Sequence, residues 1–434
     1  MFFFSDDIRP LLPLYVTMFL ETVGSGLVAS VLGVVARDDL GCSTMQVGIM
    51  WSSYNAALIL GSLVMGHFSD FVRRKYVLMV TLLWVGGGYI LTGFSDSFEW
   101  LLISRIVTGL CGGSFSVAAS ILTANLSSEV LPMAIGRLAT CASLGFAVGP
   151  LLSSAITAIW DVDSTSPFYL QRLYFFVTAF VYVLAALTAS RLQGSLTCPS
   201  RMKTVERSRD GQITRSLCLV WSSRYFSTCA VTGVYVTQVS MWREYLGFDR
   251  IYISLLTTAS GLAVSIVQAF VFPVLVARIG FHQALLIGIS FISLSCALIG
   301  PLTVIYGSMV FHIVCLCLFW FGVACMEPGT VVAVSRHLKQ SSLFPSTRRD
   351  LHTGLAMGIT SAMKYAASLS IPTVAGLLYD HHREVVYYVL SGVSFVGLIV
   401  VLAAWRLFTA RVSETVEKQS SDDSTTECQT TPSV

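Results

Sequence analysis

Charged side chains are scarce in this chain of 434 residues. Asp, Glu, Lys and Arg together make up 12% of it, whereas hydrophobic residues make up 54%. A water-facing surface needs about twice that share of charge. The composition therefore excludes a water-soluble enzyme, a nucleic-acid-binding protein and a disordered chain. The apolar runs are continuous and do not alternate with polar residues, which excludes an outer-membrane β-barrel as well.

The sequence also lacks the patterns that carry covalent chemistry. It contains no Gly-x-x-x-x-Gly-Lys-Ser/Thr nucleotide loop, no combination of nucleophile and base, and no spacing of metal ligands. We therefore expect neither an enzyme nor an ATP-driven pump, and we expect no cofactor and no metal. Most of the 11 cysteines fall within apolar runs, where they act as small apolar side chains rather than as a disulfide framework.

Apolar runs of membrane-spanning length are what the chain has instead. A spanning helix needs about 20 apolar residues, and the runs cover residues 11–35, 46–66, 76–94, 100–124, 134–158, 170–192, 214–240, 251–276, 281–301, 303–334, 351–378 and 385–408. The predicted fold is an all-α membrane protein with twelve transmembrane helices in two six-helix bundles. The predicted parts are an N-terminal bundle at 1–192, a cytoplasmic linker at 193–213, a C-terminal bundle at 214–410 and a disordered cytoplasmic tail at 411–434, which is rich in Ser, Thr and acidic residues.

The placement of Lys and Arg predicts the orientation. If both termini are cytoplasmic, 19 of the 27 Lys and Arg residues lie in cytoplasmic segments, five lie on the opposite side and three lie within spans. Positive charge concentrates on the cytoplasmic side of membrane proteins, so we expect both termini and the linker there. Trp100, Trp160 and Trp242 fall near predicted outer ends, where aromatic belts form. Nothing in the sequence distinguishes the plasma membrane from an organelle.

Three motifs lie in the first predicted bundle. The chain reads GHFSDFVRRK between the second and third spans, and GFAVGPLLSS within the fifth. The marker residues are Gly66, Asp70, Arg74 and Lys75 after the second span, Arg105 and Gly109 in the fourth, and Gly145, Gly149 and Pro150 in the fifth.

These motifs, in this order and on these spans, resemble the signature motifs of the major facilitator superfamily. The stretch LETVGSG at 20–26 is similar to the opening of the drug:proton antiporter branch, which includes tetracycline efflux proteins. The resemblance covers roughly residues 10–410. The chain departs from the family pattern at a few positions, with Phe71 in place of Arg, Arg73 in place of Gly, Thr108 in place of Gln, and Ser153 and Ser154 in place of a Gly pair.

The resemblance implies a secondary active transporter that moves a small organic solute by alternating access, with proton-coupled export. Its partners would be the solute, the proton and the lipid bilayer, with no nucleic acid, and the chain would act as a monomer. Two alternatives stay open. One is an organic-anion or metabolite uniporter or symporter, and the other is a non-transporting sensor of transporter fold.

The motif residues suggest how such a protein changes shape. Asp70 is expected to face the N-terminus of the eleventh span near 350–354, where free N–H groups and the helix dipole favour an anion. That contact would exist in one arrangement of the bundles. The alternative is that the loop only sets topology. Gly145, Gly149 and Pro150 let the fifth helix bend and pack closely, which we expect to be against a helix of the other half. Plain packing without a role in transport direction is the competing reading.

Five charged residues fall well inside the spans, where each charge costs about 3 kcal/mol. Glu21 is the candidate proton carrier and Arg105 its coupling partner, and a structural hydrogen bond, for example between these two, is the alternative. Glu327 and Lys364 either pair across adjacent helices or contact the solute. Arg224 is interpreted as shallow enough to reach the inner surface.

Uncharged polar and aromatic residues complete the expected binding region. The candidates for the solute site, in addition to Glu327 and Lys364, are Tyr54, Asn55, Tyr235 and Gln238, with Trp51 beside them. His312 is expected to be a hydrogen-bonded packing residue.

Overall fold

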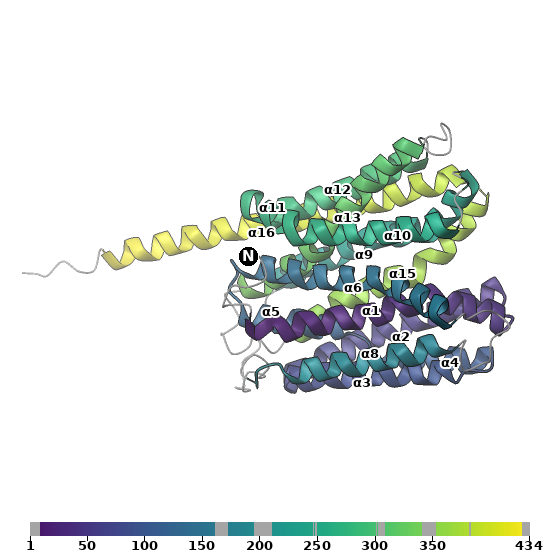
Figure 1. Cartoon of the computed structure of the whole chain (residues 1–434). Helices are drawn as coiled ribbons and strands as arrows, with labels where there is room; N and C mark the ends of the chain where they lie inside the picture. Colours follow the sequence, from purple (N-terminus) through teal and green to yellow (C-terminus); the bar gives the residue numbers. More distant parts are fainter. Residues whose placement is uncertain are drawn as a thin grey trace, which may run out of the picture.

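The computed structural model describes residues 9–160, 172–194, 211–245, 247, 250–300, 302, 309–340, 353–381 and 383–427. Within these ranges the chain forms helices and no strand. Figure 1 shows the helices running side by side in two groups, one formed by the N-terminal part of the chain and one by the C-terminal part.

The N-terminal bundle begins with a short 3₁₀ turn, η1 (Arg9–Leu11), and its first helix ends in a π-helical turn, η2 (Val35–Asp39). Its α-helices are α1 (Leu12–Val34), α2 (Thr44–Phe71), α3 (Arg74–Gly93), α4 (Phe98–Leu110), α5 (Ser114–Asn125), α6 (Leu131–Trp160) and α8 (Leu173–Ser190).

The C-terminal bundle contains one further π-helical turn, η4 (Val267–Val271), between two helices. Its α-helices are α9 (Gly211–Tyr245), α10 (Arg250–Ile266), α11 (Phe272–Ile279), α12 (Phe281–Ile299), α13 (Met309–Gln340), α15 (Thr353–His381) and α16 (Arg383–Glu427).

Twelve spans result, as the sequence predicts, because α4 with α5 forms one span and α10, η4 and α11 form another. Ten of the described spans are long and apolar enough to cross a membrane. The two others, α9 and α15, are long enough but carry polar residues such as Arg224 and Lys364. A charge near the centre of a lipid-facing helix is costly, so these two helices are the ones expected to face the protein interior.

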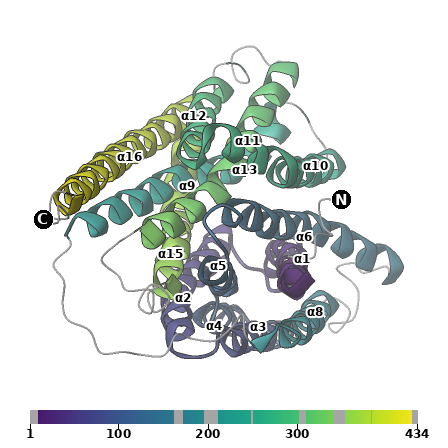
Figure 2. The same cartoon turned by 90° about the vertical axis from the view of Figure 1, so that its left-hand side faces the viewer.

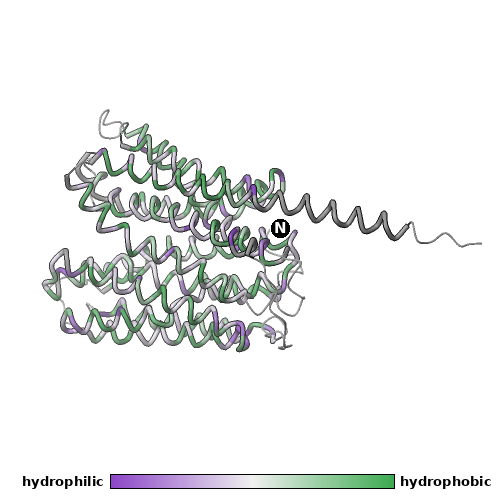
Figure 3. The backbone as a smooth tube through the Cα atoms, turned by 180° about the vertical axis from the view of Figure 1, so that it is seen from behind, coloured by the Kyte–Doolittle hydropathy of each residue, from purple (hydrophilic) through white to green (hydrophobic). Residues whose placement is uncertain are grey.

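The outer faces of both bundles are apolar. Large side chains such as Trp84, Phe180 and Phe395 are exposed there, and Figure 3 shows hydrophobic residues along the length of the helices with hydrophilic ones gathered toward the ends. Exposed apolar surface of this extent fits a bilayer and not water. The chain is thus a multi-pass integral membrane protein.

Helices of the two bundles meet at the centre of the molecule. Figure 2 shows α15 beside α2, and α6 beside α10 and α13. Glycine permits the closest approach, because a Cβ atom at Gly66 would lie 2.6 Å from the Gly354 carbonyl oxygen and 3.0 Å from the Gly358 Cα. On the α6 side, a Cβ at Gly261 would lie 2.8 Å from the Ala147 Cβ.

The fifth span packs against helices of the other half, as predicted, but it does not do so through the predicted glycines. Gly145 and Gly149 pack against α1 of the same bundle, where added Cβ atoms would meet Val23 and Gly26. The face of α6 that meets the other bundle carries Ala147 instead. Sequence spacing shows that a small-residue face exists, but it does not show which neighbour covers that face.

Two further expectations differ from the structure. The helix α16 continues to Glu427, into the tail expected to be disordered, because no Gly or Pro lies between Gly397 and Glu427 to interrupt a helix that the span has already nucleated. Trp242 is fully buried and donates a 2.6 Å hydrogen bond from Nε1 to His312 Nε2, so it is a packing residue and not part of an aromatic belt. Trp100 is exposed as expected.

Most of the predicted linker, residues 195–210, lies outside the described residues.

Candidate functional site

Asp70 joins the two bundles at the end of the molecule where α1 begins. It lies in the last turn of α2 and is 2% exposed. Its Oδ1 accepts a 2.8 Å hydrogen bond from the Gly354 N–H, and its Oδ2 accepts one of 3.0 Å from the Leu355 N–H. These amides belong to the first turn of α15, where unpaired N–H groups and the helix dipole stabilise an anion. The predicted contact between Asp70 and the eleventh span is confirmed.

The cations of the same motif have different partners. Arg74 is buried, and its Nη2 lies 3.9 Å from the Asp70 Oδ1 within the N-terminal bundle. The Lys75 Nζ donates a 3.2 Å hydrogen bond to the Leu192 carbonyl, just beyond the end of α8. Lys75 therefore binds within its own bundle, and Asp70 makes the contact with the other bundle.

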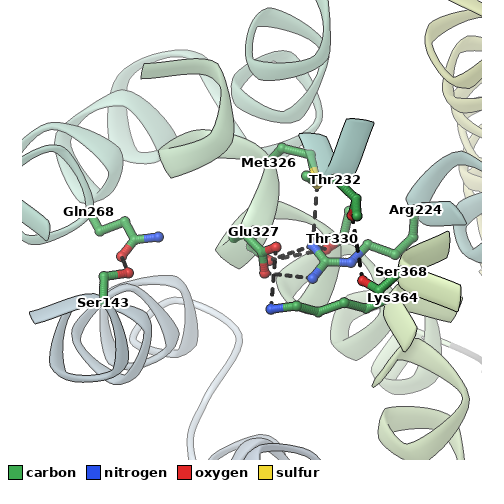
Figure 4. A network of polar contacts seen from close by, with 9 residues as sticks. All are labelled: Ser143, Arg224, Thr232, Gln268, Met326, Glu327, Thr330, Lys364 and Ser368. Carbon is green, nitrogen blue, oxygen red and sulfur yellow. Dashed lines mark hydrogen bonds and ion pairs between the residues drawn. The ribbon is translucent and has the colours of Figure 1, made fainter. Parts of the chain in front are cut away.

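Further polar contacts between bundles lie at the same end. Arg336 Nη2 donates to the Ser128 carbonyl at 3.0 Å, and the Thr123 and Ser335 hydroxyls are 2.9 Å apart. Nearer the middle, Ser143 donates to Gln268 Oε1 at 2.8 Å (Figure 4).

Glu21 lies near the middle of α1 and faces a break in the fourth span. Residues 111–113 interrupt the helix between α4 and α5, and Gly113 adopts φ +129°, a conformation that favours glycine. The break places Ser114 at the start of α5, where its hydroxyl donates to Glu21 Oε1. The second oxygen, Oε2, is buried and has no hydrogen-bond partner in the described structure.

Arg105 does not pair with Glu21. It is 2% exposed, and its Nη2 donates to Thr92 Oγ1 at 2.6 Å and to Thr108 Oγ1 at 3.2 Å. Its guanidinium also lies 4.9 Å from the ring centre of Tyr89 and 5.6 Å from that of Tyr54. Among the described residues it has no carboxylate partner, so hydroxyls and aromatic faces stabilise this cation.

The charges of the C-terminal bundle form one network, drawn in Figure 4. Arg224 of α9 lies 2.5 Å from Glu327 of α13, and Lys364 of α15 lies 3.6 Å from the other oxygen of the same carboxylate. The predicted pairing of Glu327 with Lys364 is confirmed. The interpretation that Arg224 reaches the inner surface is wrong. Its side chain is 4% exposed and points to Glu327, with further contacts to Met326 and Thr330.

The network extends to residues that connect the two halves. Tyr365, which the sequence analysis missed, interacts electrostatically with both Glu21 and Glu327. It also interacts with Tyr54, which itself lies near Arg105 and Glu21. The central region therefore includes residues of both bundles.

The remaining predicted site residues differ in their exposure and contacts. Tyr235 is 42% exposed and packs edge-on against Trp320 at 4.9 Å between ring centres. Gln238 is 3% exposed, which places it inside the bundle and removes it from contact with a solute in this state. Asn55 donates a 2.9 Å bond to the carbonyl of Trp51, one turn earlier in α2.

A surface hollow of about 480 Å³ lies elsewhere, against α3 and α8. Its lining is apolar and includes Gly86, Gly87 and Phe180. It faces outward beside exposed side chains such as Leu83. Its lining contains none of the charged residues that are found at the centre of the molecule.

The structure is similar to solved transporters over most of its length. The match with the human organic anion transporter MFSD10 covers 92% of this chain and all of that protein, with a TM-score of 0.71 at 15% identity. A bacterial homologue of the iron transporter ferroportin, solved in an outward-facing state, matches with the same TM-score at 14% identity and covers 92% and 100% of the two chains. At these identities the likeness shows the fold.

The sequence has relatives among bacterial resistance proteins. The class B tetracycline resistance protein of Escherichia coli is 21% identical over 410 residues, which cover 93% of this chain and 98% of that protein. The quinolone resistance protein NorA of Staphylococcus aureus is 21% identical over 391 residues and covers 90% and 95%. The sequence profile of the Major Facilitator Superfamily matches residues 14–344 and 220–430. This chain belongs to the major facilitator superfamily.

Proposed function

We propose that this transporter moves a small organic solute by alternating access and couples its export to the proton. The two bundles would rock about the central region, so that Glu21, Tyr365 and Glu327 face each side of the membrane in turn.

The observation that carries the proposal is the set of contacts that Glu21 makes. A carboxylate in a membrane span is costly and is usually paired with a cation. In the described structure Glu21 instead has one oxygen on Ser114 and one without a partner. Without a cation beside it, this carboxylate can lose its charge by binding a proton, and Oε2 is available to receive that proton. A carboxylate with a purely structural role would instead need a cation partner in every state.

The polar contacts at one end support the alternating geometry. Asp70 and Thr123 of the N-terminal bundle contact the C-terminal bundle, and Arg336 of the C-terminal bundle contacts Ser128, all at the end where α1 begins. With 19 of 27 cationic residues assigned to that side, we propose that this end and both termini are cytoplasmic. The described state would then be closed toward the cytoplasm.

Export is the proposed direction because of the relatives. Proteins that match over nine-tenths of this chain are named for resistance to tetracycline and to quinolones. Removing a compound from the cell is the way in which a transporter lowers its internal concentration.

The test is flux into proteoliposomes that contain the purified full-length protein. Tetracycline, a quinolone and a panel of organic cations and anions would be added with and without an imposed pH gradient. We expect accumulation of at least one compound that depends on the gradient. Glu21→Gln should abolish this accumulation and leave downhill exchange partly intact, whereas Glu99→Gln, an exposed acid at the start of α4, should behave like the wild type.

Each rival has a distinct outcome. Flux that ignores the pH gradient in both wild type and Glu21→Gln indicates a uniporter. Accumulation that persists unchanged in Glu21→Gln removes Glu21 from the coupling step. The absence of flux for every compound, from protein that is folded and reconstituted, favours a sensor.

A further inference from the structure

The charges within the spans do not balance. The central parts of the described spans hold three cations, Arg105, Arg224 and Lys364, against two carboxylates, Glu21 and Glu327. The membrane makes an unbalanced charge expensive, so the location of the excess positive charge indicates what the site is built to bind.

Arg105 is not the source of the excess. Two threonine hydroxyls and two aromatic rings surround it, and 2% of the residue is exposed. A solute therefore has no access to its guanidinium in this state.

Arg224 already neutralises Glu327. It lies 2.5 Å from Oε2, is 4% exposed, and also donates to Thr330 at 3.0 Å. A carboxylate carries a single negative charge, so the cluster of Arg224, Glu327 and Lys364 retains a net charge of about one positive unit when all three are ionised.

Lys364 carries that excess in accessible form. Its side chain is 45% exposed, against 21% for Glu327, and its ammonium is 3.6 Å from the carboxylate, a longer distance than that of Arg224. An ammonium has three donors, and Glu327 can occupy only part of them. Figure 4 shows Lys364 and Arg224 approaching Glu327 from different helices.

Aromatic side chains lie on the same helices as this cluster. Tyr365 follows Lys364 in α15, and Tyr235 of α9 is 42% exposed. Trp320 supports the Tyr235 ring from behind. An accessible cation in a bundle that also exposes an aromatic ring matches a solute that has an acidic group on an aromatic or apolar body.

We propose that the solute is an organic anion whose carboxylate, sulfonate or phosphate group binds Lys364, with its apolar part against Tyr235 and Tyr365. The proposal rests on the proposed transport function. It concerns the charge of the solute and holds for either direction of coupling to Glu21.

The site is connected to the contact between bundles through one helix. Lys364 belongs to α15, the helix whose first turn binds Asp70. A solute that draws Lys364 away from Glu327 thus acts on the element that closes one end of the molecule.

The experiment measures equilibrium binding to the full chain purified in detergent, without a pH gradient. The probes are naphthalene compounds of similar size that carry a carboxylate, a sulfonate, a phosphate, an ammonium or a neutral hydroxymethyl group. We expect at least one anion to bind about tenfold or more tightly than the neutral and cationic probes, as expected for a charge-assisted hydrogen bond.

Four variants separate binding from folding. Lys364→Gln should remove the preference for the anion, Lys364→Arg should keep it, and Arg191→Gln, an exposed cation at the end of α8, should leave it unchanged. Glu327→Gln should strengthen anion binding because it removes the competing carboxylate and still accepts a hydrogen bond from Arg224. A residue with a purely structural role would weaken binding in both Lys364→Gln and Glu327→Gln.

The overturning results are equally specific. Anions that bind no better than the neutral probe, an ammonium probe that binds best, or an anion preference that survives in Lys364→Gln would each refute the proposal. If Lys364→Gln does not fold, weaker anion binding in Glu327→Gln refutes it. Since binding requires no gradient, these outcomes are independent of whether Glu21 couples transport to the proton.

Discussion

Arg224 is the residue that most changes the interpretation of the C-terminal bundle. Its position in the sequence permits a long side chain to reach the membrane surface, whereas the structure directs it inward to Glu327. Hydropathy gives the depth of a residue along a helix but not the direction of its side chain. The pairing of Glu327 with Lys364 was predictable because two opposite charges on adjacent spans are cheaper together.

Removing one member of this network should have effects that depend on which charge is stranded. Glu327→Ala leaves Arg224 buried without a counterion, so we expect the largest loss of stability, on the order of 3 kcal/mol. Lys364→Ala should cost much less, because Glu327 keeps Arg224. The double variant Arg224→Met, Glu327→Met should recover most of the stability lost in Glu327→Ala.

The measurement for this series is the apparent melting temperature of each variant in detergent, compared with surface expression. Equal losses in Glu327→Ala and Lys364→Ala would show that Arg224 is not the main partner. A double variant less stable than Glu327→Ala would contradict the stranded-charge explanation.

At the scale of elements, the twelve spans were predictable because apolar runs of this length have no alternative in a membrane. The breaks within them were not. Residues 111–113 contain Gly112 and Gly113, but only the close contact of Gly113 with Ser62 of α2 explains why the helix is interrupted there. The spacing of Gly354, Gly358, Ser361 and Tyr365 marks one face of α15, and this pattern would have been a usable signal for Tyr365.

The contact of Asp70 with the first turn of α15 predicts a measurable change in the balance of states. Asp70→Asn keeps the shape of the side chain but removes the charge that the helix dipole stabilises, a loss of about 1 kcal/mol. The population in which the bundles separate at this end should therefore rise about fivefold.

A cysteine that replaces Thr353, which is 3% exposed, reports this separation. We expect a thiol reagent to label Thr353→Cys about fivefold faster when Asp70→Asn is also present. The exposed acid Glu129, at the same end, provides the control Glu129→Gln. Equal labelling rates with and without Asp70→Asn would mean that this contact does not hold the two bundles together.

At the scale of the whole molecule, orientation can be tested without any knowledge of the solute. Arg191→Cys lies at the end that we propose to be cytoplasmic, and Asp96→Cys, in the loop between α3 and α4, lies at the opposite end. In intact cells a membrane-impermeant maleimide should label Asp96→Cys alone, and permeabilised cells should show labelling of both. Labelling of Arg191→Cys in intact cells would reverse the orientation.

Alternating access is the central claim of this account, and the distances between the bundles at their two ends test it most directly. A Cβ at position 66 cannot fit against α15, whereas Gly48, in the same helix, has open space around it. Gly66→Ala should therefore separate the bundles at the Asp70 end, and Gly48→Ala should not.

The measurement uses pairs of spin labels in a background without accessible native cysteines. One pair replaces Arg191 and Arg278 at the Asp70 end, and the other replaces Asp96 and Met309 at the opposite end, all exposed positions. Relative to the wild type, Gly66→Ala is predicted to lengthen the Arg191–Arg278 distance and to shorten the Asp96–Met309 distance, while Gly48→Ala changes neither. Two distances that stay fixed, or that lengthen together, would contradict a rocking motion of two rigid bundles.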